Sequence, residues 1–117
     1  MCIRDSDGIA GLTDETPDSI FHKSTMHCIG GLTLQAGKFT DETGMCRFDL
    51  IDGESVYMNY KGKGTGGKGG TGTFIIMKGT GKYENITGTG VSSRQNLMSK
   101  APGFTTSMNQ MSGEYKY

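Results

Sequence analysis

The chain has 117 residues, 33% of them hydrophobic, with no tryptophan and a formal net charge of zero. This length fits one small domain, and the low apolar content allows only a modest core. The balanced charge argues against a general nucleic-acid-binding protein or one strongly attracted to membranes. The longest apolar string, about four residues, is far below the roughly 20 residues that span a bilayer.

The beginning of the chain does not resemble the rest of it. Residues 1–6, Met-Cys-Ile-Arg-Asp-Ser, resemble an in-frame translation of a sequencing-library adapter, and we expect them to be foreign to the domain. The native start would then be missing, and the lack of a visible signal peptide would carry no information. Residues 7–19 are rich in acids and turn formers, which predicts an extended arm or a truncated strand. We assign residues 20–117 to a single β-barrel domain.

The first predicted strands lie between residues 20 and 51. Residues 20–34 alternate loosely in polarity, with a bulge or barrel corner expected at Gly30-Gly31. A turn at residues 36–37 leads to a return strand that begins at residues 38–40. A bulge or second turn is expected before the next strand, at residues 45–51.

Asp52-Gly53 is a strong signal for a β-hairpin, and residues 55–61 are predicted to form its second strand. A two-residue turn would pair Phe48 with Tyr57 and Arg47 with Met58, so that each face of the hairpin mixes polar and apolar side chains. Such mixed faces favour a barrel with a partly polar interior.

Three units of nine residues follow, each opening on Gly-Thr-Gly, between residues 70 and 96. Calcium-binding repeats of this length need an aspartate after the glycines, and no aspartate follows Gly53. We therefore predict a strand at residues 73–78, a glycine turn, and a further strand from residue 88 to residue 95. A closing strand is expected at residues 112–117. No window shows helical periodicity, so the predicted fold class is all-β, a small antiparallel barrel.

Glycine-rich residues 62–69 fit both G-x-G-x-x-G and G-x-x-x-x-G-K, two phosphate-binding patterns. Both patterns require a helix directly after the glycines, because its N-terminal amides bind the phosphate. More glycine and a strand-type run follow here, which favours a flexible hairpin tip instead.

Cys28 and Cys46 are the strongest candidate pair. A turn at Ala36-Gly37 places Cys28 nearly opposite Met45 or Cys46, and cross-strand Cβ atoms lie about 4.5–5.5 Å apart. A bridge there would stabilise the fold by roughly 3 kcal/mol in the chain-entropy model and would imply an oxidising compartment. The alternative is two buried free thiols.

No metal or cofactor is expected. His27 and Cys28 are adjacent in a strand and point to opposite faces, so they cannot share one metal centre. Other tetrahedral ligands at suitable spacing are also missing. Asn85-Ile86-Thr87 matches the glycosylation sequon, which is short enough to occur by chance.

Several motifs together resemble the allene-oxide-cyclase-like barrels, a calycin-type family related in fold to the dirigent proteins. They are His27-Cys28-Ile29-Gly30, Gly37-Lys38-Phe39, Gly44-Met45-Cys46, Asp52-Gly53-Glu54 and Gly79-Thr80-Gly81-Lys82-Tyr83 with Ile86-Thr87-Gly88-Thr89-Gly90. The likeness is to the uncharacterised bacterial branch and covers about residues 25–97. It implies an eight-stranded antiparallel barrel with a cavity, often exported and often oligomeric. Lys78 stands where the family commonly has glycine, and no residue matches the catalytic positions of the plant enzymes.

We expect a secreted or periplasmic barrel that binds an apolar or amphipathic small molecule, with no nucleic-acid or membrane partner and with homo-oligomerisation left open. The alternatives are a cofactor-free cyclase-like or dirigent-like enzyme, or a barrel filled by its own side chains that serves as an interaction module. Catalytic residues are not assigned. The predicted lumen-lining residues are Phe48, Tyr57, Met58, Arg47, Phe74 and Ile76. The predicted structural turn motif comprises Gly79, Gly81, Lys82, Tyr83, Gly88 and Gly90.

Overall fold

A computed structural model describes residues 2–9, 18–99 and 101–117, which form one antiparallel sheet. Its strands are β1 (Cys2–Ile9), β2 (Thr25–Leu32), β3 (Lys38–Asp49), β4 (Ser55–Thr65), β5 (Gly69–Gly79), β6 (Thr87–Leu97) and β7 (Thr106–Lys116). A single 3-10 turn, η1 (Gly81–Tyr83), is the helical part of these described ranges. The predicted all-β, antiparallel class is confirmed.

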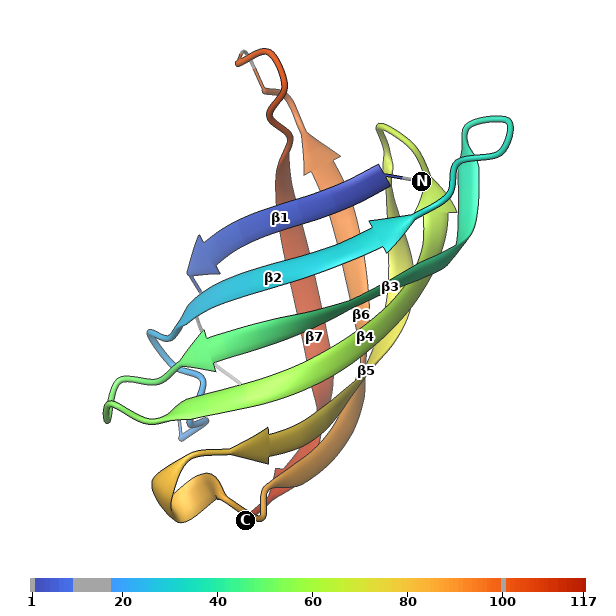
Figure 1. Ribbon diagram of the computed structural model, residues 1–117. Coiled ribbons are helices and arrows are strands. Elements are labelled where there is room, and N and C mark those ends of the chain that lie inside the picture. The colour runs from blue at the N-terminus through green and yellow to red at the C-terminus, as the bar shows by residue number, and fades with distance from the viewer. Residues whose placement is uncertain (1, 10–17, 100) are drawn as a thin grey trace.

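The strands follow one another across the sheet in the order β1 to β7, so each pairs with its neighbours in sequence (Figure 1). This meander places alternate loops at opposite ends. The β2–β3, β4–β5 and β6–β7 loops share one end, which we call the upper end. The β3–β4 and β5–β6 loops lie at the other, the lower end.

The sheet curls strongly but is not closed into a barrel: within the described chain, β1 pairs with β2 and β7 pairs with β6. The segment before β2 reaches across the curl to β7. The Ile20 amide donates to the Tyr115 hydroxyl at 3.1 Å, and the Phe21 ring packs edge-on against Tyr115 and against Phe48 on β3. The two sides of the sheet are therefore joined by side chains at the lower end.

Strand boundaries differ from the predicted ones in several places. β1 runs across the boundary expected at residue 6, and residues 10–17 of the predicted arm lie outside the described residues. β3 continues through residues 41–44, with a bulge against β4 between Phe39 and Glu42 in place of a second turn. β7 begins at Thr106, six residues before the closing strand that the sequence predicts.

The β3–β4 hairpin has a three-residue loop, so the two-residue turn that we predicted at Asp52-Gly53 is wrong. The Leu50 amide donates to the Glu54 carbonyl at 2.8 Å, and the Gly53 amide donates to the Leu50 carbonyl at 3.0 Å. Gly53 has φ +89°, the left-handed conformation that such a loop requires at its last position. The register shifts by one residue, which changes every face assignment in this hairpin.

With the observed register, Cys46 lies opposite Met58 and Phe48 lies opposite Val56, so the inner face of the hairpin is apolar. The prediction of two mixed faces is therefore wrong. The buried cluster inside the curl comprises Cys28, Cys46, Phe48, Leu50, Val56, Met58, Phe74, Ile76, Tyr83 and Ile86. It occupies the lower half of the interior.

The Gly-x-Gly pattern has a structural reason, since alternate residues of a strand face the interior. One row across six strands reads Gly30, Gly44, Tyr60, Phe74, Gly90 and Gly113. The Tyr60 ring lies over the first two glycines, and the Phe74 ring lies over the last two. The glycines make room for aromatic rings that lie flat on the sheet.

Replacing Gly44 with alanine is expected to lower the free energy of unfolding by about 2–3 kcal/mol, as overpacking does. A Cβ atom there would lie 2.3 Å from the Tyr60 hydroxyl and 2.6 Å from the Ile29 carbonyl oxygen, so backbone as well as side chain must move. Urea unfolding measures the loss. Gly66→Ala is the matched control, because its Cβ would lie 3.2 Å from the end of the Leu34 side chain and 3.4 Å from the Gly37 carbonyl oxygen, an ordinary contact distance for backbone. Equal effects of the two changes would contradict the proposed packing.

Candidate functional site

The upper half of the interior is the more polar half: besides the buried Leu32 and Phe39, it contains an ion pair between Glu42 on β3 and Arg94 on β6. Both guanidinium Nη atoms donate to the carboxylate, at 3.3 Å and 3.1 Å. The side chains are 7% and 17% exposed, respectively. Because β3 and β6 are not neighbours in the sheet, this bidentate pair spans the concave side.

A glycine and an aromatic ring lie against this ion pair. Glu42 lies opposite Gly62, where a Cβ atom would come within 2.7 Å of the carboxylate oxygen. The Arg94 guanidinium lies 5.9 Å from the centroid of the Phe39 ring, a cation–π contact. The glycines of β4 and β5 thus leave space for the Glu42 side chain. We had predicted only a flexible hairpin tip for this glycine-rich stretch.

Within the part of the chain that the structure describes, two buried polar atoms of this region have no hydrogen-bond partner: the Nε of Arg94 and the Oδ1 of Asn96. Leaving such a group unsatisfied costs about 1–3 kcal/mol. Both belong to residues of β6 that alternate with exposed ones and so face the interior. One is a donor and the other an acceptor, so together they could receive a ligand group that both accepts and donates.

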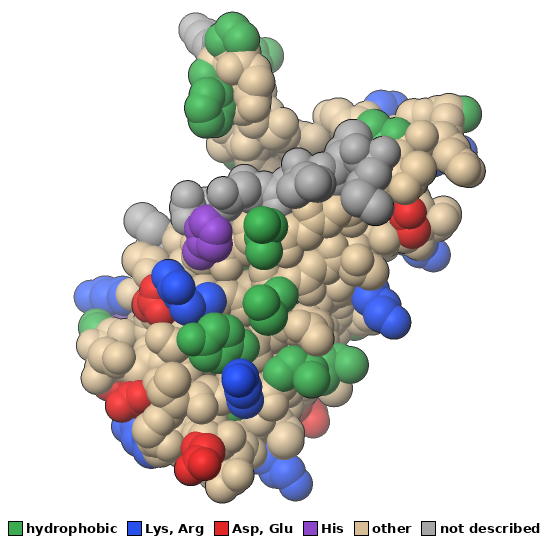
Figure 2. Space-filling model, viewed as in Figure 1, with side chains coloured by type: hydrophobic (Ala, Val, Ile, Leu, Met, Phe, Trp, Pro, Cys, Tyr) green, Lys and Arg blue, Asp and Glu red, His purple; other side chains and the backbone are tan. Residues whose placement is uncertain are grey.

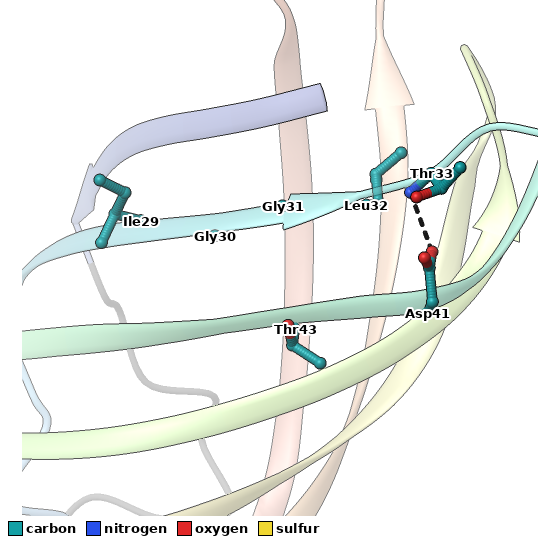
Figure 3. Close-up of a pocket in the computed structure, with 7 residues that line it drawn as sticks. All are labelled: Ile29, Gly30, Gly31, Leu32, Thr33, Asp41 and Thr43. Atoms are coloured by element: carbon teal, nitrogen blue, oxygen red, sulfur yellow. Dashed lines mark hydrogen bonds between the residues drawn. The ribbon is translucent and has the colours of Figure 1, made fainter. Parts of the chain in front are cut away.

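A shallow groove of about 360 Å³ lies along β2 and β3. In Figure 3, Ile29 stands at one end of it and Asp41 at the other, with Gly30 and Gly31 between them. The Thr33 amide donates to Asp41 at 2.9 Å, and this contact holds the pKa of the carboxyl below its ordinary value. Asp41 is therefore charged at neutral pH and already engaged by its neighbour.

A further polar cluster lies at the lower end. It joins two of the motifs that carry the family resemblance, the β3–β4 loop and the β5–β6 turn. The Tyr83 hydroxyl donates to Asp52 at 2.7 Å, and the Lys82 ammonium lies 3.4 Å from the same carboxylate. The Thr80 hydroxyl donates to Glu54 and accepts from the Ser55 amide. The β5–β6 turn is thereby fastened to the β3–β4 loop.

The pKa shifts in this cluster follow from these contacts. The hydrogen bond from Tyr83 lowers the pKa of Asp52, and burial together with the same bond raises the pKa of Tyr83. The bond to Asp52 raises the pKa of Lys82. Each shift favours the protonation states that form the contacts at neutral pH, so we interpret the cluster as structural.

Four of the six predicted lumen residues come together inside the sheet: Phe48, Met58, Phe74 and Ile76 are all buried in one cluster. Arg47 and Tyr57 lie opposite each other on the outer, convex face, where Arg47 contacts Asp49 and Tyr57 contacts Lys78. Their assignment to the lumen is wrong. Neighbours in a strand point to opposite faces, and the observed register turns Cys46 and Phe48 inward.

Cys28 and Cys46 lie directly opposite each other on β2 and β3, and their sulfur atoms are at bonding distance, 1.96 Å. The predicted pairing is confirmed. Gly79 ends β5, and Gly81 (φ +54°) begins η1 with Lys82 and Tyr83. Gly88 and Gly90 lie on the inner face of β6, beneath Ile76 and Phe74.

Sequence reasoning did not find Glu42 or Asn96. Glu42 lies in the stretch that we had interpreted as a bulge or turn, and Asn96 lies near the end of a polar strand. The available signal was the strict alternation of β6, which places Arg94 and Asn96 on the same face as Gly88 and Gly90.

In the described ranges, His, Cys, Asp and Glu side chains form no group of three that could hold a metal ion. No helix in the same ranges has the length and apolar character needed to span a bilayer. Comparisons of the chain with protein-family models, with curated proteins and with solved structures find no match.

Proposed function

We propose that the protein binds an amphipathic small molecule, with the polar group of the ligand in the upper half of the interior. The observation that carries this proposal is that the buried Nε of Arg94 and Oδ1 of Asn96, two positions apart on the inner face of β6, have no hydrogen-bond partner among the described residues. A carboxylic acid, amide or hydroxyl-bearing ligand would supply a partner to each atom. The apolar part of the ligand would lie toward the open upper end.

In the described chain, the lower half of the interior offers no comparable space for a ligand. Phe48, Met58, Phe74 and Ile76 are each at most 7% exposed and pack against one another. A ligand there would have to displace the core. If the upper half is also closed to ligands, the protein is an interaction module filled by its own side chains, which is the second candidate function.

A pair of neighbouring serines on β6 distinguishes these two functions. Ser92 faces the interior, whereas Ser93 faces outward and is exposed. We expect decanamide to bind the wild type in isothermal titration calorimetry, because its amide group both accepts and donates hydrogen bonds, and Ser92→Leu to weaken binding at least tenfold by filling the space. Ser93→Leu should bind as the wild type does. No heat with decanamide or decanol, or equal losses in both variants, would favour the self-filled module.

A cyclase-like or dirigent-like enzyme is the weaker alternative. Acid–base chemistry in the interior would need a buried ionisable group with a shifted pKa. Among the described residues, the buried group whose pKa is raised is Tyr83, and it donates to Asp52 at the lower end, away from the polar half. In the polar half, Arg94 already binds the Glu42 carboxylate.

The Cys28–Cys46 pair supports an oxidising compartment, and we propose secretion or export to a periplasm on that ground. The relation to allene-oxide-cyclase-like barrels also remains a proposal. It is supported by the contact between the segment of residues 79–83 and the segment of residues 52–54. These are two of the motifs that carry the resemblance, and here they hold the β5–β6 turn against the β3–β4 loop.

A further inference from the structure

The upper end of the sheet carries exposed apolar side chains at its loop tips. Leu34 in the β2–β3 loop is 45% exposed, and Met98 and Phe104 in the β6–β7 loop are 89% and 75% exposed. The β6–β7 hairpin projects beyond the rest of the sheet, and Figure 2 shows hydrophobic side chains gathered at its end. Single exposed apolar residues are ordinary, but a group at projecting tips of one end indicates a contact surface.

The charge of the same end is basic. Lys38 and Lys68 are exposed at the β2–β3 and β4–β5 loops, and Lys63 is exposed near the end of β4. The described residues of the three upper loops, 33–37, 66–68, 98–99 and 101–105, contain no acid. Asp41, an exposed acid of β3 near this end, accepts from the Thr33 amide.

Acidic side chains lie at the lower end, in the segment before β2, the end of β3 and the two lower loops: Asp18, Asp49, Asp52, Glu54 and Glu84. The same end also carries Lys23, Lys78, Lys82 and Lys116, so its charges are nearly balanced, whereas the described charges exposed at the upper end are mainly basic. The partner of the upper end should therefore be negatively charged and apolar beneath its charged surface. Two copies meeting by their upper ends would instead oppose lysine to lysine.

We propose that the upper end docks on an anionic lipid surface, in contrast to our expectation, from the balanced charge of the whole chain, that the protein has no membrane partner. Phe104 and Met98 enter the boundary between headgroups and acyl chains, while Lys38, Lys63 and Lys68 face the lipid phosphates. Apolar burial and electrostatic attraction add in such a contact, so neither a neutral bilayer nor high salt should support it fully. This docking does not depend on the interior ligand site proposed above.

The chain has no tryptophan, so one introduced indole reports its own surroundings. We expect the emission of Phe104→Trp to shift to the blue on vesicles of equal parts phosphatidylcholine and phosphatidylglycerol, and brominated lipid to quench it. Ile51→Trp is the matched control, because Ile51 is an exposed apolar residue (71%) in a loop of the lower end. Its emission should not change.

Sedimentation with the same vesicles tests the contact without an introduced reporter. Met98→Ser/Phe104→Ser should lower the partition coefficient at least about tenfold, since two apolar side chains are lost from the interface. Lys38→Gln/Lys68→Gln should also lower it and weaken its salt dependence, whereas Lys116→Gln at the lower end should not.

Three results would overturn the docking. The first is no shift of Phe104→Trp on anionic vesicles, and the second is an equal shift of Ile51→Trp. The third is undiminished partition onto phosphatidylcholine alone. A blue shift that depends on protein concentration without vesicles would assign the β6–β7 tip to a second copy of the chain instead.

Discussion

Replacing Arg94 with methionine is expected to lower the free energy of unfolding by about 3–5 kcal/mol, the usual cost of breaking a buried ion pair from one side. Glu42, whose side chain is 7% exposed, would lose the guanidinium that binds both of its oxygens. The cation–π contact with Phe39 would be lost as well. Urea unfolding followed by circular dichroism measures the change.

Two further variants separate charge from shape at this site. Glu42→Leu/Arg94→Met removes both charges and should recover most of the lost stability, because well-packed apolar residues often replace a buried pair without loss. Arg94→Lys keeps the charge but loses the planar fork, so it should fall between wild type and Arg94→Met. A loss below about 1 kcal/mol in Arg94→Met, the range of an exposed pair, would mean that the pair is solvated and does not span the interior.

Removing the Cys28–Cys46 bridge is expected to lower the free energy of unfolding by about 3 kcal/mol, because the reduced chain gains the freedom of the loop that the bridge closes. The bridged residues are separated by 18 positions, and both are buried in the core cluster. Cys28→Ala/Cys46→Ala should therefore unfold at a clearly lower urea concentration than the oxidised wild type.

A reducing agent supplies the control for this change. Dithiothreitol should move the wild-type transition toward that of Cys28→Ala/Cys46→Ala and leave the double variant where it was. If the wild-type transition is the same with and without dithiothreitol, while mass spectrometry shows the bridge present in one sample and absent in the other, the bridge contributes little stability.

The Cys28–Cys46 pairing was predictable to within one residue because the turn that connects the two strands is local. Ala36 and Gly37 both have positive φ, as a two-residue hairpin turn requires, and Gln35 pairs with Lys38 across it. That turn alone would place Cys28 opposite Met45. The observed register, with Cys28 opposite Cys46, is shifted by one residue between this turn and the pair Gly31–Thr43. The sequence analysis had left both partners open.

The β3–β4 register was not predictable from Asp52-Gly53, since this dipeptide fits a two-residue turn and also a longer loop with glycine last. The side chain of Asp52 accepts from the Glu54 amide at 3.0 Å, which favours the longer loop. Asp52 is held in turn by Tyr83 and Lys82, about 30 residues further along the chain. No local pattern contains that contact.

The candidate site was not predictable from the sequence for a similar reason. Glu42 and Arg94 are 52 positions apart and lie on strands that do not pair, so only the curl of the sheet brings them together. Strand alternation predicts which face each residue occupies. It does not predict how tightly the sheet bends, which depends on the glycine rows and the rings above them.

The meander has a consequence for the order in which the molecule folds. Every strand pairs with its neighbour in sequence, and the connections between β2 and β6 are short, so each of these hairpins can form as soon as its two strands exist. Two contacts join residues that are far apart in the sequence: Arg94 with Glu42, and Tyr115 with Ile20. They hold the sheet in its curled shape and are not needed to pair its strands. We expect pulsed hydrogen exchange to find the hairpin amides protected before the Ile20 amide. Simultaneous protection would mean that pairing and bending are one event.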